Sequence, residues 1–257
     1  MLIVVSPAKS LDFETKAPSK KFTEPDYLEE STQLVGQLQN LSPDDFSELM
    51  HISSSLGELN HQRFANWHTP FDLDNAKQAI FAFKGDVYIG LEAEQFSTAD
   101  LNFAQNHLRI LSGLYGLLRP LDLMQPYRLE MGSRFQNKKG KNLYEFWGDK
   151  LTDNLNELFE QDKKPVLVNL ASKEYFSAIK PSSLNAEIIS PVFKDFSNGK
   201  YKIVSFFAKK ARGYMTAYII KNRIKDPKKL REFDVDGYHY SEDQSTASEP
   251  VFLRDAQ

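Results

Sequence analysis

Two short runs of aliphatic residues, far apart in the chain, constrain the fold more than any other feature of the sequence. Leu2–Val5 is an apolar, β-branched run closed by Ser6 and Pro7, and Pro165–Leu170 is a second run of this kind. Runs of this length bounded by turn residues are typical of buried strands. Asn142–Glu160, just before the second run, carries apolar residues at helical spacing. The sequence therefore predicts an α/β fold of mixed (α+β) type, in which helices surround a mixed sheet.

Further segments extend this alternation of helices and strands. Tyr27–Leu41 and Ala208–Arg223 also show helical spacing of apolar residues. Because no repeat, linker or break in composition divides the sequence, we expect residues 1–257 to form a single domain. The predicted strands are Ile80–Gly90 as strand, turn and strand with Gly85 and Asp86 in the turn, Ala186–Phe196 and Tyr201–Ala208 as a hairpin around Asn198 and Gly199, and Pro250–Leu253 as a last edge strand.

Composition excludes several classes of protein. The chain has no cysteine, so disulfides, thiolate metal sites and cysteine nucleophiles are ruled out, and a reducing compartment is expected. The first residues lack the basic region and the long apolar stretch of a signal peptide, and no later stretch reaches the roughly 20 apolar residues of a membrane span. We therefore expect a cytoplasmic protein with no membrane partner.

Charge is distributed very unevenly along the chain. The net charge is −3, yet residues 194–231 hold twelve Lys and Arg against only Asp195 and Asp226, a local charge of +10. Residues 22–60 hold eight acids and no Lys or Arg. A basic segment in an acidic protein indicates a surface for a polyanion such as DNA. The alternative is a solvated surface whose charges pair with the acidic N-terminal quarter.

The basic segment has its centre on the predicted helix 208–223. On a helix, Lys209 and Arg212 lie on one face and Lys210 lies beside it. These three side chains are the first candidates for contacts with a DNA backbone.

A pair of glycines supplies a second candidate element. Gly113 and Gly116 lie three residues apart between flanks compatible with helices, and Arg109 and Arg119 stand on either side. Open backbone N–H groups in such a connection can hold an anion. The segment resembles a helix-hairpin-helix element, which binds DNA phosphates without reading bases, and Arg128 would add to its charge. The alternative is a glycine turn packed for structural reasons.

A third group of residues suggests a reactive pocket. Lys9 follows the first strand, Asp86 and Tyr88 lie in the predicted 80–90 turn, and Glu130 lies two residues after Arg128. A lysine near a carboxylate in dry surroundings can act as a nucleophile toward a carbonyl or an abasic sugar. The alternative is that Lys9 is a phosphate contact or an ion-pair partner.

Other enzyme classes lack their sequence signatures. Motifs of the types HExxH, GxSxG, GxxxxGK[ST] and GxGxxG do not occur. The histidines show no paired metal spacing, so neither a metal site nor a cofactor is predicted. They are His51, His61, His68, His107 and His239.

Five motifs together resemble those of the YaaA family of bacterial peroxide-stress-resistance proteins. They are SPAK at 6–9, FKGDVY at 83–88, the block from LSGLYG to RPLDLMQPYRLEM at 111–131, NLAS at 169–172 and AKKARG at 208–213. The resemblance implies a cytoplasmic protein of the hydrogen peroxide response, which limits oxidative damage to DNA and proteins by keeping unincorporated iron low. It also implies an α/β fold with a helix-hairpin-helix element, a positively charged cleft and binding of double-stranded DNA.

Three hypotheses for function follow. The first is a non-enzymatic protein that binds duplex DNA largely without sequence specificity. The second is a DNA-processing or base-directed enzyme in which Lys9 is the nucleophile and Asp86 or Glu130 the acid/base partner. The third, weaker hypothesis is an iron-handling or protein-interaction role. For the first hypothesis, the predicted DNA-binding residues are Lys9, Arg109, Gly113, Gly116, Arg119, Arg128, Lys209, Lys210 and Arg212.

Overall fold

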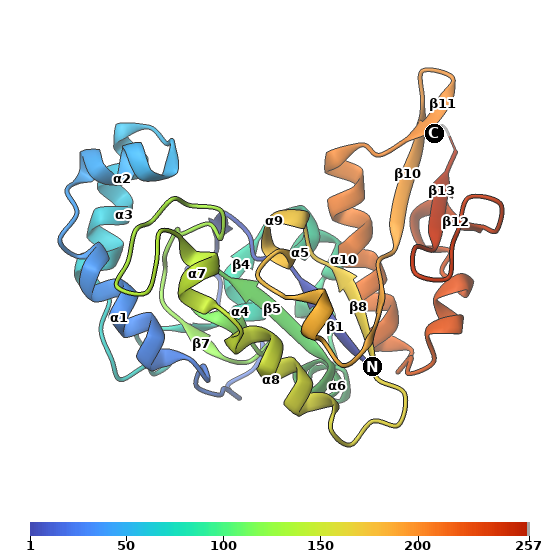
Figure 1. Ribbon diagram of the computed structural model, residues 1–257, viewed down its shortest axis with the longest axis horizontal. Coiled ribbons are helices and arrows are strands. Elements are labelled where there is room, and N and C mark those ends of the chain that lie inside the picture. Colours follow the sequence, from blue (N-terminus) through green and yellow to red (C-terminus); the bar gives the residue numbers. More distant parts are fainter. Residues whose placement is uncertain (256–257) are drawn as a thin grey trace.

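The computed structural model describes residues 1–255, and a five-stranded sheet lies at its centre (Figure 1). β1 (Leu2–Val5) is the middle strand, and it runs parallel to β5 (Leu108–Ser112) on one side and to β8 (Val166–Leu170) on the other. β9 (Glu187–Ile189) continues the parallel set beyond β8, and β6 (Gly116–Leu118) pairs antiparallel with β5. The first aliphatic run thus forms the central strand. Both of its faces are buried, which explains why all of its residues are apolar.

A second, four-stranded sheet is built from the C-terminal third of the chain. β10 (Val192–Ser197) and β11 (Lys200–Lys202) form a hairpin at the predicted turn, but both strands are shorter than predicted. Residues 187–189 form β9 of the central sheet, and residues 205–208 belong to a helix. β13 (Val251–Arg254) pairs with β10 on one side and with β12 (Tyr238–Ser241) on the other. The expectation of an edge strand at 250–253 is therefore wrong, because β12 pairs with β13 and is itself the edge strand.

The segment 80–90 does not form the predicted strand, turn and strand. It contains α4 (Ala79–Ala82), the two-residue strand β4 (Phe83–Lys84) and α5 (Asp86–Leu91). Gly85 precedes α5 with φ 158°, so it starts a helix and does not turn a hairpin. Tertiary packing against α10 (Ser205–Lys221) outweighs the local preference of this apolar, aromatic run for strand.

The N-terminal helices α1 (Leu28–Leu38), α2 (Pro43–Met50) and α3 (Ser54–Asn66) lie at the opposite end of the molecule from α10 and the second sheet (Figure 1). Ser42 begins α2 with a capping box, in which its side chain accepts from the Asp45 N–H. The remaining elements are β2 (Ser10–Leu11), β3 (Lys77–Gln78), α6 (Thr98–His107), β7 (Leu123–Met124), α7 (Leu143–Trp147), α8 (Lys150–Phe159), α9 (Lys173–Phe176) and the 3₁₀ turns Ala93–Gln95, Pro181–Ser183, Pro227–Glu232 and Val235–Gly237.

Buried hydrophobic residues from both ends of the chain belong to one continuous cluster, which includes Ile3 of the central strand and Phe252 of the second sheet. The prediction of a mixed α/β fold is confirmed, whereas the prediction of a single domain stays a prediction. Among residues 1–255, no helix combines the length and the apolar character needed to cross a membrane.

Candidate functional site

A cavity opens at the edge of the central sheet where the parallel strands β1 and β8 end. Residues 6–10, which follow β1, line it together with Ser172, which lies two residues past β8. Residues 85–88 at the start of α5 also line it, as do Lys209 and Arg212 of α10. The cavity volume is about 450 Å³. Ligands of open α/β sheets bind outside the carboxyl ends of the strands, so we place the candidate site here.

Two serines join the loops that leave β1 and β8. The Ser172 N–H donates to Ser6 Oγ at 2.8 Å, and the two hydroxyl oxygens lie 3.3 Å apart. The Tyr88 hydroxyl donates to the Ser6 carbonyl at 3.1 Å. Burial raises the pKa of Tyr88 well above its ordinary value, so this hydroxyl is a neutral donor. The bonds fix the position of both strand-end loops.

Lys9 and Glu130, predicted as possible members of a reactive pocket, do meet in this cavity. Lys9 Nζ lies 2.9 Å from Glu130 Oε2, and Arg128 donates to Glu130 Oε1 at 3.2 Å. Asp86 lines the same cavity but, within residues 1–255, forms no ion pair with Lys9. The Lys9 side chain is 65% exposed, whereas an activated lysine needs dry surroundings. The geometry is that of an ion pair open to solvent.

The two cations of α10 differ from Lys9 in having no acidic partner. Across the described part of the chain, residues 1–255, neither Lys209 nor Arg212 forms an ion pair or a side-chain hydrogen bond. Burial lowers the pKa of Arg212, because removal from water penalises the charged guanidinium. A guanidinium remains protonated in spite of such a shift. The cavity therefore contains a partly buried positive charge that forms no ion pair within residues 1–255.

Close contact between α5 and α10 holds these cations at the cavity. A Cβ atom added at Gly213 would lie 1.9 Å from the Val87 carbonyl oxygen, and one at Gly90 would lie 2.2 Å from the Lys210 carbonyl oxygen. Both positions thus need glycine, because the two backbones nearly touch. Lys210, by contrast, does not line the cavity, and its ammonium lies 5.3 Å from the centre of the Tyr214 ring.

The paired glycines do not form a helix-hairpin-helix element, and that prediction is wrong. Gly113 lies in the tight turn between β5 and β6, and Gly116 begins β6 with φ 69°. An added Cβ would lie 2.3 Å from the Leu129 carbonyl oxygen at Gly113, and 2.8 Å from the Trp147 ring at Gly116. Because this β-hairpin is enclosed on both sides, its N–H groups cannot approach a phosphate.

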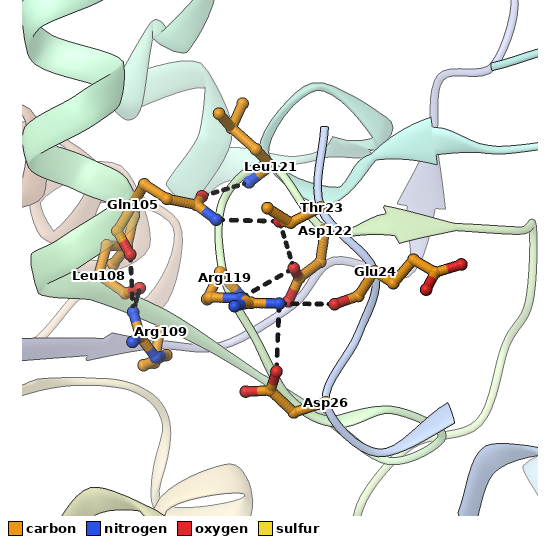
Figure 2. Close-up of polar contacts among 9 residues, drawn as sticks. All are labelled: Thr23, Glu24, Asp26, Gln105, Leu108, Arg109, Arg119, Leu121 and Asp122. Atoms are coloured by element: carbon orange, nitrogen blue, oxygen red, sulfur yellow. Dashed lines mark hydrogen bonds and ion pairs between the residues drawn. The ribbon is translucent and has the colours of Figure 1, made fainter. Parts of the chain in front are cut away.

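Arg109 and Arg119, predicted to flank a DNA-binding hairpin, are engaged inside the protein (Figure 2). Arg109 is 6% exposed and donates to the carbonyl oxygens of Gln105 and Leu108 at 3.0 and 2.8 Å. Arg119 pairs with Asp122 at 3.0 Å and with Asp26 at 3.1 Å. Arg119 joins the N-terminal segment to the core, whereas Arg109 bonds only to its neighbours in the chain. Neither arginine flanks an open hairpin as predicted, because Arg109 is buried and Arg119 is already paired.

Several residues that line the cavity were not predicted from the sequence. Ser6, Lys84, Ser172, Glu174 and Tyr175 all face the cavity. A signal for the two serines was present, because each follows a buried aliphatic run, and the ends of parallel strands meet at one edge. Glu174 Oε1 accepts from the Gly132 N–H at 2.9 Å, and Glu174 also lines an adjoining cavity of about 830 Å³ that reaches α2.

Metal ligation has no support among the described residues. No three side chains of His, Asp or Glu within residues 1–255 gather as they would around an ion. The carboxylates of the cavity are instead interleaved with Lys9, Lys84, Lys209 and Arg212. The arrangement is suited to holding an anion by charge and hydrogen bonding.

Comparison with known proteins identifies the family. Residues 1–244 match the family described as peroxide stress protein YaaA. Two similar curated proteins, both named UPF0246 protein, come from Teredinibacter turnerae and Saccharophagus degradans. They are 56% and 57% identical to this chain over 254 residues, which is 99% of this chain and 99% of each relative. The chain therefore belongs to the peroxide stress protein YaaA family.

Proposed function

We propose that this protein binds duplex DNA, largely without sequence specificity, through the mouth of the cavity between β1, β8, α5 and α10. The observation that carries the proposal is the pair Lys209 and Arg212, two cations at one cavity with no acidic partner within residues 1–255. Lys9 stands at the same cavity, and Lys210 adds charge beside it on α10. Phosphate groups are bound by such charge-assisted contacts, which carry no sequence information.

The acidic N-terminal quarter does not neutralise the basic segment within the molecule. Ion pairs of residues 22–60 run from Asp26 to Arg119 and from Glu30 to Lys150, and none in the described chain reaches residues 194–231. α1–α3 also lie at the far end of the molecule from α10 (Figure 1). Arg223 of the basic segment pairs with Asp100 at 2.7 Å, but its other Lys and Arg side chains form no ion pair within residues 1–255. Most of the local charge is therefore available to a partner, and this favours DNA over internal pairing.

Membership of a peroxide stress family suggests what DNA binding by this protein would be for. On this proposal the protein acts in the cytoplasm, where it covers DNA and limits the damage that peroxide and unincorporated iron inflict on it. A link to iron homeostasis then operates through protection of DNA, since the described residues supply no metal cluster. The measurement for this step is the rate of strand breakage of plasmid DNA by peroxide and ferrous iron, with and without bound protein.

Binding itself is tested by fluorescence anisotropy with three labelled duplexes of unrelated sequence, each titrated from about 50 to 200 mM salt. A protein held by phosphates loses affinity linearly on a log–log plot, and the three slopes agree. Absence of binding at the lowest salt would remove DNA as the partner. A strong preference for one sequence would contradict binding by phosphates alone.

A second candidate function is a DNA-processing enzyme with Lys9 as the nucleophile. It is favoured by one observation, that Lys9 and the two predicted acid/base partners, Asp86 and Glu130, line the same cavity; the solvent-open ion pair of Lys9 with Glu130 argues against it. An amine nucleophile would condense with the aldehyde of an abasic site, releasing water and forming an imine, and borohydride would reduce that imine to a stable secondary amine. Trapping with wild type but not with Lys9→Ala would support this function. No adduct with wild type would eliminate it.

A further inference from the structure

The shape of the cavity limits which part of a DNA molecule can enter it. Its volume of about 450 Å³ is in the range of pockets that hold one small molecule. An internal phosphodiester has a nucleotide attached on each side, so on a duplex it meets these cations only from the mouth of the cavity, where Lys209 is exposed. A terminal group has one attachment only. A strand end or a free nucleotide can therefore enter the cavity and approach both Lys209 and the half-buried Arg212 more closely.

The charge inside the cavity suits a phosphate monoester better than a diester. A monoester carries about −1.5 to −2 charges near neutral pH and presents three strong acceptor oxygens. Lys209 and Arg212 supply two positive charges without an acidic partner in the described chain. The hydroxyls of Ser6 and Ser172, at the ends of β1 and β8, add hydrogen-bonding groups at the same cavity.

Carboxylates on other walls offer acceptors for the rest of a nucleotide. Within residues 1–255, neither carboxylate oxygen of Asp86 accepts a side-chain hydrogen bond, and Glu174 uses only Oε1, toward the Gly132 N–H. Free carboxylate oxygens are suitable partners for the amino groups of bases, as in the contacts that acidic side chains make to cytosine N4. The cavity thus combines cations for a phosphate with acceptors for a base.

We propose that the cavity binds a nucleotide through its terminal phosphate monoester, with Lys209 and Arg212 as the phosphate ligands. This inference rests on the proposed DNA binding and deepens it, because it separates contacts with the duplex backbone at the cavity mouth from capture of a terminal phosphate inside. The monoester has two sources, the 5′-phosphate of a DNA strand end and a free mononucleotide.

The test uses three closed dumbbell duplexes without free ends, identical except for one position. The first is intact, the second carries a nick with a 5′-phosphate, and the third carries the same nick with a 5′-hydroxyl. We expect the 5′-phosphate nick to bind about tenfold tighter than the 5′-hydroxyl nick, which corresponds to about one charge-assisted hydrogen bond. Lys209→Gln/Arg212→Gln should abolish this preference. The single variant Lys209→Gln, at an exposed residue that does not endanger folding, should reduce it.

Free deoxyadenosine monophosphate, with deoxyadenosine as its control, distinguishes the two sources. Equal binding of both nicks, together with direct binding of the monophosphate that depends on Arg212, would support the site with a free nucleotide as its ligand. Equal binding of both nicks and no binding of the monophosphate would overturn the inference while leaving duplex binding intact. Failure to bind the intact dumbbell would instead contradict the proposed function, and the two nicked forms would still decide the inference.

Discussion

Replacement of Gly213 by Ala tests whether the contact of α5 with α10 builds the site. The added Cβ would lie 1.9 Å from the Val87 carbonyl oxygen and 2.8 Å from the Leu91 nitrogen, both backbone atoms that no rotamer change can move. Ordinary contact begins near 3.4 Å, so the helices must separate by about 1.5 Å. Overpacking of a core costs about 1–3 kcal/mol, and the higher figure applies where the backbone must move. Ala gains about 1 kcal/mol over Gly in helix propensity.

The net expectation is a loss of about 2 kcal/mol, or roughly 4–8 °C in Tm for a chain of this size. Gly36→Ala is the matched control, because Gly36 is exposed in α1 and its added Cβ meets nothing within 4 Å. That variant should gain about 1 kcal/mol, or roughly 2–4 °C. Thermal unfolding followed by circular dichroism compares the two. A Gly213→Ala protein as stable as Gly36→Ala would refute the close contact, and with it the explanation for the position of Lys209 and Arg212.

Two further predictions concern stability. Asp195→Ala removes one of the two acidic partners of Arg254, the one at 2.6 Å in a pair less than one-tenth exposed, and leaves Asp236 as the other. It also removes the acceptor of the Tyr238 hydroxyl. Breaking such a buried pair should cost about 3 kcal/mol, seen as a fall in Tm of roughly 6–12 °C, and an unchanged Tm would contradict it. Hydrogen bonds from Thr15, with the charges of Lys77 and Lys84 nearby, lower the pKa of Asp12 from 3.8 to about 2. A folded-state pKa below the unfolded value stabilises the folded state above about pH 4, and this contribution is lost as pH falls toward 2. The Tm advantage of wild type over Asp12→Asn should therefore shrink between about pH 5 and pH 3, and a constant difference would show that Asp12 acts without its charge.

The parts of the fold that were predictable have strong local signals. Leu2–Val5 and Val166–Leu170 are short aliphatic runs followed by turn residues, a pattern that favours buried strands. The turn at Asn198 and Gly199 matches the left-handed backbone that both residues adopt. The helix predicted at 208–223 is present as α10, although it begins three residues earlier, in the segment predicted as a strand. These elements were predicted because local preference and tertiary environment agree.

The errors arose where long-range packing decides the local structure. Gly113 and Gly116 were assigned to a connection between helices. Residues 108–112 instead pair with β1 as a strand of the central sheet, and the Trp147 ring packs against Gly116. Arg109 looked like a surface cation because nothing in the sequence reveals the two carbonyl groups that accept from it. A count of charged residues in the sequence includes such an arginine among the surface cations, although it is buried.

The candidate site was predictable in part for a related reason. Lys9, Asp86 and Glu130 were grouped from their positions in separate motifs, and they do line one cavity. Lys209 and Arg212 were assigned to a separate basic surface, because only the crossing of α5 and α10 brings residues more than 100 positions apart to the same place. Lys9 was the only residue common to both predictions, and the cavity brings the rest of the two groups together.

The salt dependence of DNA binding in two matched double variants tests the central claim most directly. Lys209→Gln/Arg212→Gln removes two charges at the cavity, and Lys228→Gln/Lys229→Gln removes two exposed charges elsewhere in the same basic segment. Each lost phosphate contact should reduce the log–log salt slope by about 0.9, so the cavity variant should lose about 2 from its slope while the control keeps the wild-type value. Equal slopes in the two variants would contradict a DNA site at the cavity, since the charge of the segment would then act without regard to position.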